Sequence, residues 1–190
     1  MNFVTHLKMA SMFESRFSSL PSFRKTSFMF GNVKPDIRFN ALHEPHMKEY
    51  NYLKFVDMVQ SLPYLLDSPH AFSIRLGEVM HHLCDYFCLP HRDIKLYHQL
   101  KWHFNYENAL ERMIDKLKLP SEALFNSIDI PHYDDFFDCI HEMIIYYDQF
   151  PHSIEKDIAF TFSVVNRVSQ LLVVQLNAVS VLSHEHSPIY

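Results

Sequence analysis

The sequence predicts an all-α protein that folds as a single-domain helical bundle over residues 1–190. Only two glycines occur, and long amphipathic runs outnumber stretches in which apolar and polar residues alternate. Because glycine is the usual residue of tight turns and β-bulges, its scarcity argues against a strand-rich fold. With 48% hydrophobic and 21% charged residues, the chain has a globular composition and can bury a sizeable core.

The charge and the cysteines limit the partners and the location. The net charge is −5 with neutral histidines, and no basic run is present, so duplex nucleic acid is not an expected partner. The three cysteines, Cys84, Cys88 and Cys139, include no Cys-x-x-Cys pair, and free thiols are expected. The N-terminus lacks a charged leader followed by an apolar segment. These features predict a cytoplasmic protein without a signal peptide.

The first predicted helix spans residues 4–20 and presents His6 in its first turn. An apolar segment, Phe28–Phe30, continues until Gly31, which we expect to end or bend the chain before Pro35. The next residue, Asp36, would then lie on a constrained loop as a candidate metal ligand. An Asp after Pro also suits a helix cap or a turn, and that interpretation stays open.

A second helix is expected to open at His43-Glu-Pro-His46 and to run to about Leu66. One or both of these histidines can face inward, whereas isolated histidines are usually surface polar groups. Residues 92–98 are expected to form a connection. Further helices are expected, in chain order, at about 70–88, 99–118, 121–128, 133–149 and 153–183.

The last of these helices is apolar enough to be considered as a membrane span. Polar side chains from Asn166 to Asn177 interrupt it, Arg167 among them, and charge at mid-bilayer depth is costly. We therefore expect a buried core helix and no transmembrane helix.

Five potential metal ligands lie in the central part of the chain. His81 and Asp85 are four residues apart, as are His103 and Glu107, so each pair lies on one face of a helix. His91 follows a proline, which does not continue a helix, and is therefore directed toward a neighbouring site. Any one of these residues alone is most simply a polar surface residue, but the spacing of all five predicts a cluster of metal ions.

Four segments in this order resemble the zinc-dependent phospholipase C family, bacterial enzymes that include the clostridial alpha-toxin catalytic domain. They are Thr5-His6-Leu7, the Gly-x-x-x-Pro-Asp segment 31–36, the segment Gly-Glu-x-Met-His-x-x-x-Asp-x-x-x-x-x-His at 77–91, and His-x-x-x-Glu at 103–107. Together they cover residues 5–107, more than half of the chain.

The resemblance implies two or three Zn²⁺ ions in a cleft of a helical bundle. By residue, the first ion would be held by Asp36, His81, Asp85 and either His43 or His46, the second by His91, His103 and Glu107, and the third by His6, a bridging Asp85 and the main chain of the N-terminal residue. His46 fits the longer loop of the relatives better than His43. Secreted members expose an N-terminal Trp at the third ion, whereas this chain begins with Met1.

The resemblance also implies a hydrolase in which metal-activated water attacks the phosphorus of a phosphodiester. Asp36 would be the catalytic residue that orients or deprotonates this water. The substrate would be a phospholipid, with peripheral membrane contact, or a small phosphodiester. Choline recognition is not implied, because lipase members carry a Tyr where this chain has Ile37.

Two alternatives remain. Single-strand nucleases with a related zinc site usually complete the second ion's ligands with Asp, where this chain has Glu107. A bundle without enzymatic activity could keep the same ligands as a structural metal centre. The acidic composition and Glu107 favour the phosphodiesterase over the nuclease, and the sequence leaves the structural centre open.

Overall fold

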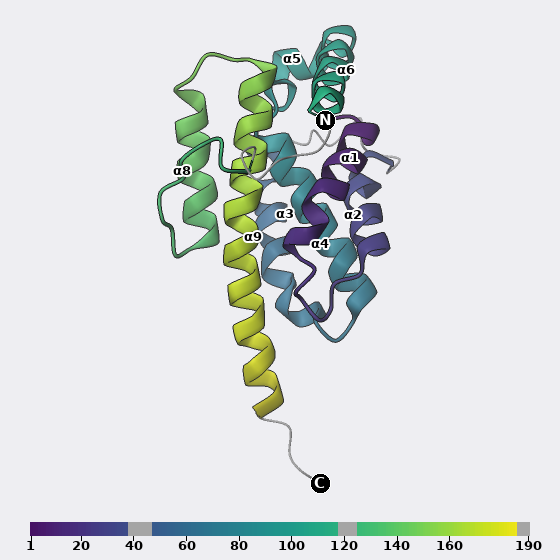
Figure 1. The fold of residues 1–190 in the computed structure, drawn as a ribbon. Coiled ribbons are helices and arrows are strands. Elements are labelled where there is room, and N and C mark those ends of the chain that lie inside the picture. The colour runs from purple at the N-terminus through teal and green to yellow at the C-terminus, as the bar shows by residue number, and fades with distance from the viewer. Residues whose placement is uncertain (38–46, 118–124, 186–190) are drawn as a thin grey trace.

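The computed structural model describes residues 1–37, 47–117 and 125–185. These residues form eight α-helices and no strand, which confirms the predicted all-α fold (Figure 1). The helices are α1 (Phe3–Phe13), α2 (Lys25–Ile37), α3 (Lys48–Ser61), α4 (Pro69–Tyr86), α5 (Ile94–His98), α6 (Leu100–Lys116), α8 (Phe136–Asp148) and α9 (Ile154–Glu185). Three short 3₁₀-helices join them: η1 (Glu14–Arg16), η2 (Pro63–Leu65) and η3 (Leu89–His91).

Helix α4 occupies the middle of the bundle. It begins with Pro69, whose missing N–H costs nothing at a first helical position, and it contacts α1, α2, α3 and α9. Because it has neighbours on several sides, every residue from Leu76 to Tyr86 is buried. The metal-ligand candidates His81 and Asp85 therefore lie in the interior, where a polar group needs a partner.

Two glycines allow α2 and α4 to cross closely. A Cβ atom at Gly31 would lie 2.2 Å from the carbonyl oxygen of Ile74, and one at Gly77 would lie 2.3 Å from that of Phe28. Both positions therefore need glycine because of the helix crossing. The expectation that Gly31 ends or bends the chain is wrong, since α2 continues through it to Ile37.

Asp36 accordingly lies in the last turn of α2, directly after Pro35, and the expected loop is absent. Pro35 cannot donate a hydrogen bond to the carbonyl group of Gly31, so α2 lacks one helical bond close to its C-terminal end. This correction moves a candidate ligand from a loop onto a helix that packs tightly against α4.

Several helix ends also differ from the prediction. The first helix ends at Phe13 and passes into η1, where the expected helix runs to residue 20. Helix α3 ends at Ser61, two residues before Pro63, which starts η2. The expected connection at 92–98 contains α5, which Asp93 caps by accepting the N–H groups of Lys95 and Leu96. Of the helix expected at 121–128, residues 121–124 lie outside the described residues, and in the described part only Phe125 is helical. His43 and His46 also lie outside the described residues.

The last helix, α9, runs beside α8 on one side and α4 on the other (Figure 1). Its segment Ile154–Val179 is, by length and composition, the one described helix that could cross a membrane. However, in the most apolar stretch of 18 residues within this segment, 67% is buried inside the protein. In this structure α9 packs as the core helix that the sequence predicts.

Candidate metal centre

Two groups of buried ligand atoms lie side by side in the bundle. We call His6, His81 and Asp85 the first cluster, and His91, His103 and Glu107 the second cluster. Within each cluster the ligand atoms all lie within 4.8 Å of one another. The clusters combine α1 with α4, and η3 with α6, so the fold brings together segments from distant parts of the sequence.

The first cluster is centred on Asp85. Its Oδ2 lies 3.2 Å from Nε2 of His81, and its Oδ1 lies 3.2 Å from Nε2 of His6. The rings of His6 and His81 stack with centroids 3.8 Å apart. The i, i+4 pair on α4 thus converges as its spacing predicts, and α1 adds the third side chain.

The second cluster is centred on Glu107. Its Oε1 lies 2.8 Å from Nε2 of His103 and 3.2 Å from Nε2 of His91. The same nitrogen of His91 lies 3.6 Å from Oδ1 of Asp85. The two clusters therefore form one continuous polar centre, with His91 and Asp85 at their boundary.

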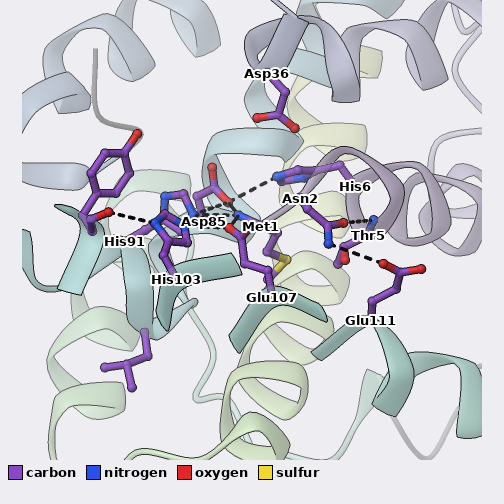
Figure 2. A network of polar contacts seen from close by, with 12 residues as sticks. Met1, Asn2, Thr5, His6, Asp36, Asp85, His91, His103, Glu107 and Glu111 are labelled. Atoms are coloured by element: carbon purple, nitrogen blue, oxygen red, sulfur yellow. Dashed lines mark hydrogen bonds and ion pairs between the residues drawn. The ribbon is translucent and has the colours of Figure 1, made fainter. Parts of the chain in front are cut away.

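The α-amino group of Met1 lies at this boundary (Figure 2). It is fully buried, forms an ion pair with Asp85, and lies 3.2 Å from Oε1 of Glu107 and 2.7 Å from Nε2 of His91. The start of α1 holds it there: Asn2 caps the helix by accepting the N–H of Thr5 at 2.8 Å. A main-chain group at residue 1 therefore reaches both clusters.

Main-chain carbonyl groups orient two of the histidine rings. Nδ1 of His81 donates to the carbonyl oxygen of Asn32 at 2.8 Å, and Nδ1 of His103 donates to that of Tyr97 at 3.0 Å. With the hydrogen on Nδ1, Nε2 of each ring faces its cluster carboxylate and could offer its lone pair to a metal ion between them. Metal-binding histidines are commonly fixed by such outer contacts.

Burial and neighbouring charge shift the pKa values of the centre. Burial disfavours the charged forms of Asp85 and Glu107, but nearby cationic groups, including the Met1 amino group, hold both carboxyl pKa values well below their usual range. Burial lowers the pKa of His91 to about 4, so its ring is neutral near pH 7. Ionised carboxylates and neutral imidazoles are the protonation states that bind metal ions.

The donor set and its spacing fit Zn²⁺. Two ligand atoms about 2.1 Å from a tetrahedral zinc ion lie roughly 3.4 Å apart, and the nitrogen-to-carboxylate distances within the clusters are 2.8–3.2 Å. Nδ1 of His6 is buried without a hydrogen bond in the described part of the chain, and Nε2 has the 3.2 Å contact with Asp85 but no hydrogen bond of regular geometry there. A cation between these groups would satisfy polar atoms that are otherwise costly to bury.

Asp36 lies at the edge of the first cluster. Its Oδ1 is 3.8 Å from Nε2 of His81, and its side chain is 21% exposed, whereas those of His81 and Asp85 are fully buried. Figure 2 shows its carboxylate directed toward the centre from α2. Asp36 is thus the carboxylate of the centre with the most access to solvent.

Histidines outside the two clusters take other partners. His82, next to His81 on α4, lies within hydrogen-bonding distance of Asn51, 3.2 Å from its Nδ2. His70 pairs with Ser27, and His132 is largely exposed. All three cysteines are free and buried, as expected from their number and spacing.

The family resemblance names the main chain of the N-terminal residue as a ligand of the third ion, whereas the carbonyl partners Asn32 and Tyr97 were not predicted from the sequence. Asn2 could have indicated the position of Met1, because Asn is a favoured N-cap residue. A helix capped at residue 2 places the Met1 amino group close to the first helical turn, which leads to His6. The carbonyl groups carry no such signal, since every residue has one.

Comparison with known proteins agrees with this geometry. The family model for zinc-dependent phospholipase C matches residues 5–154. No match to the chain was found among curated proteins or among solved structures. The matched range holds every side chain of both clusters and most of the 190 residues, and the chain therefore belongs to the zinc-dependent phospholipase C family.

Proposed function

We propose that this protein hydrolyses the phosphodiester bond of a phospholipid, between glycerol and phosphate, or that of a small phosphodiester. The observation that carries the proposal is the contact between the two clusters, where Asp85 Oδ1 lies 3.6 Å from His91 Nε2. Ligands for more than one ion are thereby held next to each other, which is the arrangement used to stabilise both the attacking and the leaving oxygen of a phosphodiester.

The residues of the first cluster would hold zinc together with Asp36, and those of the second cluster would hold a neighbouring ion. When bound, zinc supplies a water of lowered pKa and neutralises charge on the phosphoryl oxygens. The carbonyl groups of Asn32 and Tyr97 keep the rings of His81 and His103 in the orientation that binding requires.

Asp36 is the residue that we assign to the attacking water. Its Oδ1 lies 3.8 Å from Nε2 of His81 and faces the first cluster, while Oδ2 is buried although the side chain as a whole is partly exposed. In that position it can accept a hydrogen bond from the attacking water and take its proton as the bond to phosphorus forms. As the new bond forms, the bond from phosphorus to the leaving oxygen breaks, and the proton passes from Asp36 through water to that oxygen, which leaves as the alcohol.

The proposal is tested with zinc-loaded protein, phosphatidylcholine and phosphatidylethanolamine in mixed micelles, and bis-p-nitrophenyl phosphate. We expect diacylglycerol or nitrophenol as products, and Asp36→Asn should lower kcat by roughly 10²- to 10⁴-fold. The exposed His132→Ala is the matched control and should keep full activity. Bound zinc without turnover of any of these substrates would contradict the proposal and favour a structural metal centre.

A further inference from the structure

A buried carboxylate outside the two clusters connects the segments that carry the second one. Asp157, in the first turn of α9, is fully buried and accepts three hydrogen bonds. Its Oδ2 accepts the Leu89 N–H at 2.9 Å and the Tyr106 hydroxyl at 2.8 Å. Its Oδ1 accepts the hydroxyl of Tyr147, on α8, at 2.5 Å. One oxygen therefore serves η3 and α6, and the other serves α8.

The two donors to Oδ2 are close in sequence to metal-ligand candidates. Leu89 begins η3, the short helix that ends with His91, and Tyr106 directly precedes Glu107 on α6. A three-residue 3₁₀-helix has little stability of its own, so its position depends on contacts with the rest of the fold. The hydrogen bond from Leu89 to Asp157 supplies such a contact.

The surroundings of Asp157 keep α9 in place. Nζ of Lys156 donates to the carbonyl oxygens of Tyr147 and Phe150, at 3.1 and 3.0 Å, and lies 3.6 Å above the Tyr147 ring. These contacts fix the start of α9 against the end of α8. The contacts between α8 and α9 thus fix the position of the Asp157 carboxylate, which in turn holds Leu89 of η3 and Tyr106 of α6.

We propose that Asp157 is a positioning residue for the second cluster, acting on His91 through the Leu89 N–H and on Glu107 through the Tyr106 hydroxyl. This inference rests on the proposed metal binding by that cluster. Asp157 lies beyond residues 5–154, the part of the chain that the family model matches.

The two tyrosines provide a matched pair of variants. Tyr106→Phe and Tyr147→Phe each remove one hydroxyl group from the same carboxylate, but only Tyr106 is adjacent to a metal-ligand candidate. Zinc affinity is measured by chelator competition, and the visible spectrum of the Co²⁺-loaded protein reports ligand geometry. His103→Ala identifies the binding step and the spectral band that belong to the second cluster.

We expect Tyr106→Phe to weaken zinc binding at the second cluster by roughly 10- to 100-fold and to change its Co²⁺ band. Tyr147→Phe should leave both within about twofold of wild type while it lowers the thermal midpoint. Equal loss of affinity in both variants would indicate general loosening and would overturn the proposal, as would wild-type affinity in both.

Variants of Asp157 itself give a rescue test. In Asp157→Asn the amide oxygen can still accept from Leu89 and Tyr106, and its NH₂ group can donate to the Tyr147 hydroxyl, so zinc affinity should be largely kept. Asp157→Ala loses all three hydrogen bonds, and its zinc affinity should be equal to or lower than that of Tyr106→Phe. Wild-type zinc affinity in a folded Asp157→Ala protein would overturn the proposal. If Asp157→Ala does not fold, the tyrosine pair decides.

The outcomes for this inference and for the proposed function are distinguishable. Wild-type protein that binds zinc without hydrolysing any substrate contradicts the function alone, because the affinity differences among the variants are still measured. Hydrolysis together with unchanged affinity in Tyr106→Phe contradicts the positioning role alone. A wild-type protein with no metal at the second cluster contradicts both.

Discussion

Nδ1 of His81 donates a hydrogen bond to the main-chain carbonyl oxygen of Asn32 across the α2–α4 crossing, at 2.8 Å. The bond directs Nε2 of His81 toward Asp85. It depends on the close approach of the two helices, which Gly31 and Gly77 permit. The orientation of a metal-ligand candidate is therefore linked to two residues that bind nothing.

This link predicts the effect of Gly77→Ala. Since the new Cβ would lie 2.3 Å from the Phe28 carbonyl oxygen, α2 and α4 must separate. We expect the free energy of unfolding in urea to fall by about 1–3 kcal/mol, with weaker zinc binding at the first cluster. Helix propensity alone would make Gly77→Ala more stable by about 1 kcal/mol. The reverse substitution Ala71→Gly, at an exposed position of α4, measures this difference in helix propensity without the helix crossing. A more stable Gly77→Ala protein would contradict the role of the crossing.

Removal of a first-cluster ligand should release metal. We expect His81→Ala and Asp85→Ala each to lower the zinc content and to lose the thermal stabilisation that added zinc gives, because bound metal stabilises only the folded form. His82→Ala is the control, since that neighbouring side chain lies beside Asn51 and outside both clusters. Unchanged zinc content in both ligand variants would refute the assignment.

Blocking the Met1 amino group should impair the centre. A Gly-Ser extension before Met1 converts the buried amine into a neutral amide and adds chain where Asp85 and Glu107 face the amine. We expect lower zinc affinity and a lower thermal midpoint. The same two residues added at the C-terminus are the control. Equal zinc binding by the two extended proteins would show that the buried amine is dispensable.

The three thiols should be protected in the folded protein. Burial raises the pKa of Cys139 to about 11, and burial raises those of Cys84 and Cys88 further. At pH 8 a thiol of pKa 11 is ionised in roughly one molecule in a thousand, and the thiolate is the reactive form. Ellman's reagent should therefore react slowly with the native protein and rapidly with all three thiols in guanidinium chloride. Rapid labelling before unfolding would place the thiols at the surface.

The sequence predicts the fold where local patterns are strong. The apolar periodicity indicates the helices, and the i, i+4 spacing brings His81 to Asp85 and His103 to Glu107. It places Asp36 wrongly because Gly and Pro usually end a helix, whereas Gly31 serves a helix crossing and Pro35 lies near a helix end.

Other features depend on contacts between residues far apart in sequence. The Met1 amine reaches Asp85 only after α1 has packed against α4, and Asp157 meets Leu89 only after α9 has packed against the same bundle. Local periodicity carries no information on such pairs. Long-range polar contacts are therefore the part of the site that the structure adds.

The most direct test of the account is the metal content of untagged protein, measured by elemental analysis together with chelator-sensitive hydrolysis of bis-p-nitrophenyl phosphate. The account predicts at least one zinc ion for each of the two clusters, and turnover that a chelator abolishes and added zinc restores. Protein that carries no zinc, or turnover that survives complete removal of zinc, would contradict it.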